Sequence, residues 1–211
     1  MENYKKNLKI LQEGHVYSKE MEHDACGVGL IASTEGKKSR KVVEYGINAL
    51  KAVWHRGAVD ADGKTGDGAG IHLEIPSDFF AEKIELTGHK HDGSEICVGM
   101  IFLPRNNYAA QENSRTLIET ELTKSNFSIY GWRQVPVNPK VLGEKANLTR
   151  PEITQVLFKH NDKTLTGKDL ERKIYESRRK IEKEAIRNSI DGLYICSLSS
   201  KSIIYKGMFL A

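Results

Sequence analysis

The order of the expected strands and helices constrains the fold of this chain more than any other feature of the sequence. Apolar alternation, short apolar runs and helical spacing define these elements. Strands are expected at 27–33, 71–75, 96–103, 127–137, 153–159, 193–198 and 202–206, and helices at 43–54, 76–84, 107–124 and 169–187. Because strands come in clusters and helices in clusters, the order favours α+β layers over a repeated βαβ unit.

Two of the expected helices have a clear apolar face. In the helix over 169–187 that face holds Leu170, Ile174, Ile181 and Ala185, and the rest is dense in Lys, Arg and Glu. In the helix over 43–54 the apolar face holds Val43, Ile47, Leu50 and Trp54. Such spacing places the side chains on one side of a helix, toward a core. Gly57 is expected to end the helix over 43–54.

The two ends of the chain have simpler patterns. The last two strands, 193–198 and 202–206, predict a hairpin around Ser199-Ser200-Lys201. Residues 1–25 predict a mobile leader with helical character around Leu8-Ile10-Leu11, and Gly27 to Ser33 predicts a short buried strand.

Composition excludes several classes of protein. The formal net charge of +4 comes from 32 basic and 28 acidic residues mixed along the chain, which is a poor pattern for nucleic-acid binding. The N-terminus lacks the apolar stretch of a signal peptide, and no apolar run is long enough to span a membrane. Three scattered cysteines favour a reducing compartment, so we expect a cytoplasmic protein.

Cys26 occupies a junction, because the polar segment ending in Asp24-Ala25 meets the small, apolar run from Gly27 to Ala32. A buried structural thiol is one interpretation. The other is a nucleophile that gains a base when the chain is cut before it, since the freed amine would have a pKa of about 7.7–8.0. The run also matches a dinucleotide fingerprint, but it follows no buried strand and opens no helix.

The loop from Asp60 to Gly70 is rich in glycine and aspartate. An EF-hand interpretation fails, because Thr65 stands where glycine is needed and Ile71 where a bidentate glutamate is needed. Just before the loop, Arg56 could cap the preceding helix or bind a carboxylate through two parallel hydrogen bonds. His89 and His91 form an H-x-H pair without a third ligand, which favours a solvated loop over a metal site.

Several of these motifs together resemble the start of glutamate synthase large chains. The motifs are Asp24-Ala25-Cys26-Gly27-Val28-Gly29, His55-Arg56-Gly57-Ala58, the run from Thr65 to Ile71, the run from Gly131 to Val137, the run from Tyr194 to Ser200, and Tyr205-Lys206-Gly207-Met208. They span nearly all of residues 22–208 in the same order. Each motif alone is unspecific, but the combination is highly specific.

The resemblance implies a class II glutamine amidotransferase domain of the N-terminal-nucleophile hydrolase type. It implies a four-layer αββα sandwich over residues 26–211, incomplete at the C-terminus, and removal of a leader of residues 1–25. Cys26 would hydrolyse L-glutamine to glutamate and ammonia. Arg56 would line the active site, holding the glutamine carboxylate or bracing the Cys26 turn. Cys97 and Cys196, on expected strands, would be core thiols.

The resemblance also implies partners outside this sequence. Ammonia would pass to a synthase domain of the same full-length chain, where FMN and an iron–sulfur cluster serve the reduction, with electrons from a reductase small subunit or ferredoxin. The oxyanion-hole Asn-Gly pair has no counterpart in these 211 residues, so we expect this stretch to be inactive alone. The alternatives are a glutaminase domain of another class II amidotransferase and a non-catalytic domain of the same fold.

Overall fold

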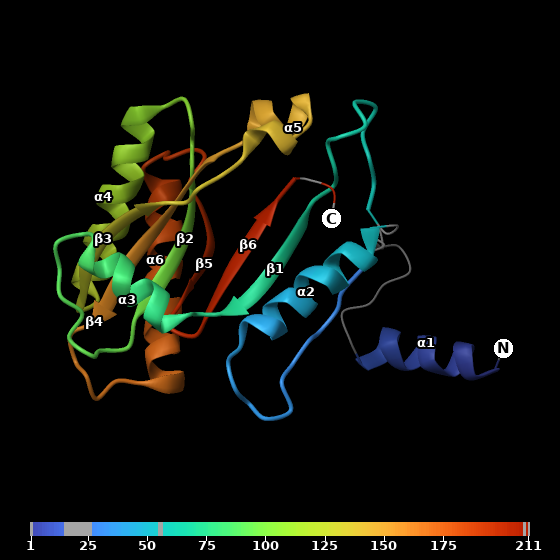
Figure 1. Cartoon of the computed structure of the whole chain (residues 1–211), viewed down its shortest axis with the longest axis horizontal. Helices are drawn as coiled ribbons and strands as arrows, with labels where there is room; N and C mark the ends of the chain where they lie inside the picture. The colour runs from blue at the N-terminus through green and yellow to red at the C-terminus, as the bar shows by residue number, and fades with distance from the viewer. Residues whose placement is uncertain (1, 15–26, 55–56, 209, 211) are drawn as a thin grey trace.

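The structure is a computed structural model that describes residues 2–14, 27–54, 57–208 and 210. Within these ranges two antiparallel sheets lie between helices (Figure 1). The strands are β1 (Ala69–Glu74), β2 (Cys97–Leu103), β3 (Phe127–Gln134), β4 (Glu152–His160), β5 (Tyr194–Ser199) and β6 (Ser202–Gly207). The helices are α1 (Glu2–Gly14), α2 (Arg40–Ala52), α3 (Ser77–Glu85), α4 (Tyr108–Lys124), α5 (Glu144–Thr149) and α6 (Gly167–Arg187), with a 3₁₀ turn η2 (Pro139–Val141).

The larger sheet has the strand order β3-β4-β2-β5, and α4 and α6 cover one of its faces. The apolar face expected for the helix over 169–187 is buried, as are Ile118 and Leu122 of α4. These side chains pack with Ile101, Val156 and Phe158 of the sheet. Burial of this face explains why α6 is stable despite the many charges on its solvent side.

A second apolar core lies between the two sheets. It joins Val98 and Met100 of β2 to Ile203 of β6, and Phe80 and Ile84 of α3 belong to the same cluster. The smaller sheet consists of β1 paired with β6, and α2 lies against β1 on its outer side (Figure 1). The layers are therefore helix, sheet, sheet and helix, which confirms the α+β sandwich that the sequence predicts.

The predicted hairpin at the end of the chain is wrong, because β5 and β6 belong to different sheets. β5 pairs with β2, whereas β6 pairs with β1. Residues 195–199 of β5 are all buried, so this strand needs cover on both faces, and β6 lies close to it. Turn chemistry does not distinguish strands that pair side by side from strands that face each other across a core.

The connection between these strands is held by hydrogen bonds within the turn and by one to α6. Ser199 Oγ accepts hydrogen bonds from the backbone N–H groups of Lys201 and Ser202, at 2.9 and 3.2 Å. The backbone N–H of Ser200 donates to Glu171 Oε1 on α6 at 2.6 Å. These bonds fix the point at which the chain crosses from one sheet to the other.

The predicted strand at 27–33 is also wrong. Residues 27–33 form no strand in the structure, and Val28 and Leu30 are 90% and 88% exposed. Apolar character alone does not make a strand, because a strand needs the N–H and C=O groups of a neighbour. Gly27 and Gly29 add a further entropic cost to an extended conformation.

The helix predicted over 43–54 is confirmed, but it ends earlier than expected. The backbone N–H of Val53 donates to the carbonyls of Leu50 and Lys51, which closes α2 after Ala52. Trp54 therefore lies beyond the helix and is 69% exposed. Gly57 follows several residues later and is not the helix stop.

The sequence analysis missed η2 and α5, the short elements that connect β3 to β4. Asn138 caps the first of them, since its side chain accepts from the backbone N–H of Lys140 at 3.2 Å. The second, α5, begins after Gly143, whose lack of a side chain leaves the helix without a local cap. Six-residue helices are too short to show a clear apolar period.

Candidate functional site

The predicted site residues Cys26 and Arg56, together with His55, lie outside the described residues. What the structure describes of this region is the loop over residues 57–68, directly joined to Arg56, which we call the glycine-rich loop. It lies at the end of the molecule where β1 begins, at the top of Figure 1.

The glycine-rich loop folds back on itself as a narrow ladder. At its base, the backbone N–H of Asp67 donates to Ala58 O at 3.2 Å. Val59 and Gly66 form an antiparallel bridge. Nearer the tip, the backbone N–H of Asp60 donates to Thr65 O at 2.9 Å. The sequence predicts only a loop here. The structure adds a set of backbone pairings that runs from the base of the loop to its tip.

The two aspartates at the tip serve as hydrogen-bond acceptors. Asp62 Oδ1 accepts from the backbone N–H groups of Lys64 and Thr65, at 2.9 and 2.7 Å, and Asp62 Oδ2 accepts from Thr65 Oγ1 at 2.6 Å. Asp60 binds Lys145 Nζ of α5 through both carboxylate oxygens, at 2.9 and 2.8 Å. Asp62 therefore holds the tip of the loop together, and Asp60 joins the loop to α5.

The same contacts set the ionisation of both carboxylates. Hydrogen bonds from the Thr65 side chain and from the backbone lower the pKa of Asp62 well below its ordinary value. The hydrogen bond from Lys145 and the one from the Ala61 backbone lower the pKa of Asp60. Because both folded pKa values are depressed, the contacts are fully formed above about pH 4 and weaken only in stronger acid.

The two other cysteines are core thiols, as the sequence predicts. Cys97 and Cys196 are free and buried. Burial, and then the negative charges of Glu95 and Glu171, raise the pKa of the Cys97 thiol. Burial also raises the pKa of Cys196. A raised pKa disfavours the reactive thiolate, so neither is suited to be a nucleophile.

The segment Gly131 to Val137 supplies polar contacts that sequence analysis did not assign. Arg133 Nη1 donates to Gln155 Oε1 at 2.8 Å, and Gln155 Nε2 donates to the Tyr205 hydroxyl at 3.2 Å. Gln155 is fully buried, so its hydrogen bonds link β3, β4 and β6 within the protein interior. A run of alternating polar residues on a strand could have indicated such a network.

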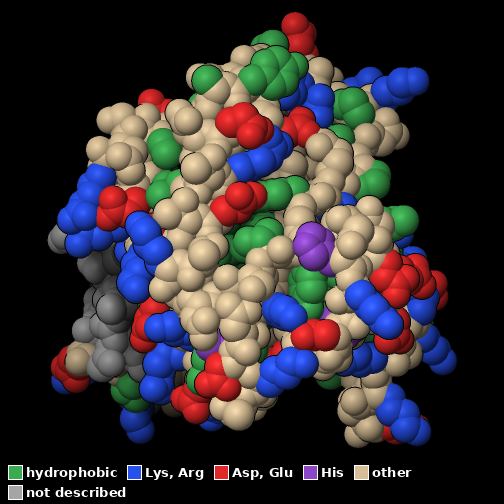
Figure 2. Space-filling model, turned by 90° about the vertical axis from the view of Figure 1, so that its left-hand side faces the viewer, with side chains coloured by type: hydrophobic (Ala, Val, Ile, Leu, Met, Phe, Trp, Pro, Cys, Tyr) green, Lys and Arg blue, Asp and Glu red, His purple; other side chains and the backbone are tan. Residues whose placement is uncertain are grey.

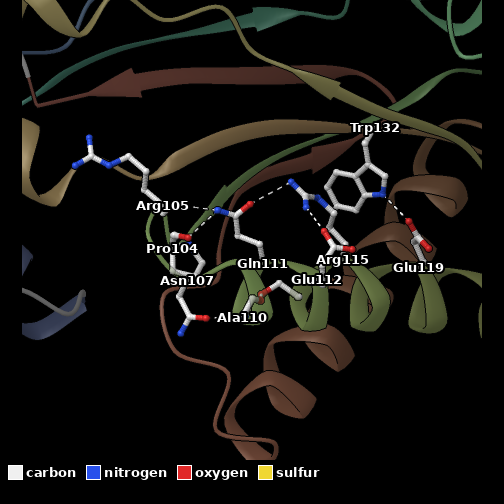
Figure 3. Close-up of polar contacts among 10 residues, drawn as sticks. Pro104, Arg105, Asn107, Ala110, Gln111, Glu112, Arg115, Glu119 and Trp132 are labelled. Carbon is white, nitrogen blue, oxygen red and sulfur yellow. Dashed lines mark hydrogen bonds and ion pairs between the residues drawn. The ribbon is translucent and has the colours of Figure 1, made fainter.

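The neighbouring Trp132 ties β3 to α4. Its indole N–H donates to Glu119 at 2.5 Å, and the Arg115 guanidinium lies 5.8 Å from the indole ring centroid. Figure 3 shows this row of contacts continuing through Gln111, whose side-chain amide donates to the carbonyls of Pro104 and Arg105. This network supports the sheet and lies on the helix side, away from the inter-sheet layer.

Neither a group of metal ligands nor a membrane-spanning helix is found among the described residues. Within the described ranges, no group of three or more His, Cys, Asp or Glu side chains is placed to hold a metal ion. His89 and His91 contact different partners, Thr87 and Ser94. No helix in the part that the structure describes is long and apolar enough to cross a bilayer. Figure 2 shows acidic and basic side chains interspersed over one face.

Comparison with protein families matches residues 26–211 to the model of glutamine amidotransferases class-II. The chain belongs to this family. The match begins at Cys26, the residue that the sequence analysis singled out, and it covers both sheets. The four layers described above are the fold of this amidotransferase domain.

Individual relatives indicate which class II amidotransferases this chain is similar to. The chain is 53% identical over 209 residues to the glutamate synthase [NADPH] large chain of Azospirillum brasilense, covering 99% of this chain and 14% of that protein. It is 39% identical over 204 residues to the ferredoxin-dependent glutamate synthase of Pyropia yezoensis, with coverages of 95% and 13%. The chain thus spans only about a seventh of the length of these relatives.

Proposed function

We propose that this chain supplies the glutaminase part of a glutamate synthase, with Cys26 as its nucleophile. The observation that carries the proposal is that the family match begins at Cys26 and that relatives of both electron-donor types are glutamate synthases. Removal of residues 1–25 would make Cys26 the N-terminal residue. Its free amine, with an ordinary pKa of about 7.7–8.0, then becomes the base next to the thiol.

The reaction follows from these groups. The amine takes the proton of the Cys26 thiol, directly or through water, and the thiolate attacks the side-chain carboxamide of glutamine. The amine returns that proton to the leaving nitrogen as the C–N bond breaks, which releases ammonia and leaves a thioester. Water then hydrolyses the thioester, which yields glutamate and restores the thiol.

Arg56 is proposed to bind the glutamine carboxylate. A guanidinium offers two parallel donors that fit a carboxylate, and its charge persists at all physiological pH values. Arg56→Lys keeps the charge but loses the planar pair of donors. We expect it to raise the KM for glutamine about tenfold or more. Unchanged glutamine kinetics would remove Arg56 from this role.

The remaining parts of the reaction are assigned to segments outside residues 26–211. Oxyanion donors would come from the polypeptide beyond residue 211, so the 211-residue chain alone is expected to release no ammonia from glutamine. The synthase part would hold FMN and an iron–sulfur cluster and would combine ammonia with 2-oxoglutarate. A reductase small subunit or ferredoxin would supply electrons, in the cytoplasm.

The test uses the full-length protein. Mass spectrometry is expected to find a mature chain that begins at Cys26, and a glutamine-shaped electrophile is expected to label that residue. Cys26→Ala is expected to abolish both labelling and ammonia release. An intact Met1 terminus on active protein, or persistent labelling of another residue, contradicts the proposal.

A further inference from the structure

The helix layer over the four-stranded sheet is open along one side. α4 packs over β3 and β2, α6 packs over β5, and β5 is the last strand of the sheet on that side. In the part of the chain that the structure describes, α6 is the only helix in extensive contact with β5, and β5 pairs within the sheet with β2 alone. The outer flank of α6 and the free edge of β5 therefore form one border of the molecule.

A groove runs along this border, with a cavity volume of about 600 Å³. Binding sites for small ligands typically have volumes of about 300–1,000 Å³, so the groove is large enough to bind part of a partner. Its apolar lining comes from the last turns of α6, the connection after them and the start of β5. These side chains are Ala185, Ile186, Ile190, Leu193, Tyr194 and Ile195. Because none of them belongs to α4, the groove lies on the outer flank of α6.

Two of the apolar side chains in this groove are unusually exposed. Ile186 is 81% exposed and Tyr194 is 45% exposed. A single exposed apolar residue is ordinary on a protein surface, but apolar residues gathered in a groove indicate an interaction site. Ile186 stands open to solvent beside the groove and does not enclose it. Since small molecules are bound in sites that bury most of their surface, this openness favours a polypeptide partner.

The charges at the rim of the groove indicate what the partner carries. Arg179 and Lys183 line the groove, and Glu182 is the only acid among the described residues that do so. Glu182 already accepts from Arg178 Nε at 2.8 Å and also pairs with Arg179. Lys183 makes no ion pair or side-chain hydrogen bond with any described residue. The rim therefore keeps a net positive charge, which is complementary to carboxylates.

The edge of β5 is less protected than the opposite edge of the sheet. β3, at that opposite edge, carries Arg133 and Gln134 and has an irregular register at Gly131. Charges and irregularities discourage pairing with a further strand. β5 also has a register shift, but it holds no charged residue and no proline. Arg178 Nη2 donates to Ile195 O at 2.8 Å and so covers one backbone group of this edge. The start of β5 is therefore suited to an extended segment that lies beside the groove.

We infer that this groove is the docking site of an extended segment of a longer polypeptide, and that the segment carries apolar side chains flanked by carboxylates. The inference rests on the proposed function only in taking the chain as part of a longer glutamate synthase polypeptide. Most of the length of the relatives lies outside the region that they share with this chain, so such a segment is covalently attached. Attachment raises its effective concentration, so a groove of this size suffices for stable docking. The apolar side chains of the segment lie against Ile186 and Tyr194, and its carboxylates pair with Arg179 and Lys183.

Zero-length cross-linking of the full-length protein tests the charge pairing. A carbodiimide joins a lysine amine to a carboxylate in contact with it, and peptide mapping identifies both partners. Lys183 is expected to cross-link to an acidic segment outside residues 1–211, at least about tenfold more than Lys180 does. Lys180 is the matched control, because it is an exposed lysine of α6 that also has no partner among the described residues. It lies about 200° around the helix from Glu182, away from the groove.

Thiol labelling of the full-length protein tests the apolar part of the docking. Ile186→Cys is expected to react with a maleimide at least about tenfold more slowly than Lys180→Cys, because the segment covers position 186. Both positions are exposed in this structure, so equal rates indicate an open groove and overturn the inference. Adding Arg179→Glu and Lys183→Glu is expected to speed labelling at position 186 by at least about threefold and to leave position 180 unchanged. Thermal midpoints measured in parallel report folding.

The identity of the cross-linked partner distinguishes this occupant from others. An assembly of isotope-labelled and unlabelled copies gives cross-links of mixed label at Lys183 if the occupant is a second copy of the protein, and that result overturns the inference. A Lys183 cross-link confined to residues 1–211 overturns it as well. Labelling of Cys26 by a glutamine-shaped electrophile tests the proposed function separately. Its absence in protein with the expected Lys183 cross-link contradicts the proposed chemistry and supports the docking site.

Discussion

The helices α2 and α6 have similar apolar faces in sequence and very different surroundings in the structure. α6 buries Leu170, Ile174, Ser177, Ile181 and Ala185 over the four-stranded sheet, whereas α2 has no buried residue. The reason is the area beneath them, since α2 lies over a sheet of only two strands. Amphipathic spacing predicts which side of a helix faces the core, but the width of the opposing sheet decides how much of that side is buried.

The largest expected effect comes from truncating equivalent side chains on these two helices. Ile174→Ala on α6 removes a side chain that is 1% exposed, and we expect a loss of about 2–5 kcal/mol in the free energy of unfolding. Ile47→Ala on α2, where the side chain is only half-buried, is expected to cost about 1 kcal/mol. Urea unfolding measures both, and equal losses would break the comparison.

Thiol reactivity sharpens the same comparison for the two cores. Cys97 belongs to the core beneath α4 and α6, and Cys196 to the core between the sheets. In a Cys26→Ala background, we expect Cys196 to react with a thiol reagent at least about tenfold faster than Cys97. The reason is that a sheet of only two strands is expected to open at a lower free energy than a sheet of four. Peptide mapping after timed labelling measures both rates. Faster labelling of Cys97 than of Cys196 would show that the core beneath α4 and α6 opens more readily than the core between the sheets.

The smallest expected effects concern two charge pairs. One joins Asp92 to Lys159 of the four-stranded sheet, and the other lies on α2, beside the two-stranded sheet. The hydrogen bond from Lys159 Nζ, at 2.7 Å, is the largest of the effects that lower the pKa of Asp92. The folded pKa lies below the ordinary value of about 3.9, so the stabilisation is complete above that pH and is lost as the pH falls further. Asp92→Asn is expected to cost about 1 kcal/mol or less at pH 7, and the deficit shrinks in acid.

The matched change beside the two-stranded sheet is Arg40→Ala, which removes the exposed ion pair between Arg40 and Glu44 on α2. We expect a loss of about 0.3–0.5 kcal/mol, as for other helix pairs at this spacing. Unfolding curves recorded from pH 7 to pH 3 measure both variants. A larger loss for Arg40→Ala than for Asp92→Asn would mean that the smaller sheet depends on its surface charges.

Most elements of the fold could be predicted from the sequence, and the failures share a cause. Helices with a long apolar period and strands with apolar runs were found within a few residues of their observed ends, because these signals are local. The strand at 27–33 and the hairpin around Ser200 failed because each depends on which partner a segment finds. The ion pair between Asp60 and Lys145 was missed because the two residues are far apart in the sequence and neither has a distinctive local pattern.

The sequence by itself determined the layered α+β class, the apolar face of α6, the buried nature of Cys97 and Cys196, and the family resemblance that the comparisons confirm. These properties follow from residue spacing and from short motifs, which act over a few positions. Only the tertiary structure decided that β5 and β6 face each other across a core, that α2 stays largely exposed, and that Lys145 of α5 pairs with Asp60 of the glycine-rich loop. Each of these depends on contacts between distant segments, whose geometry is set by the packing of the whole chain.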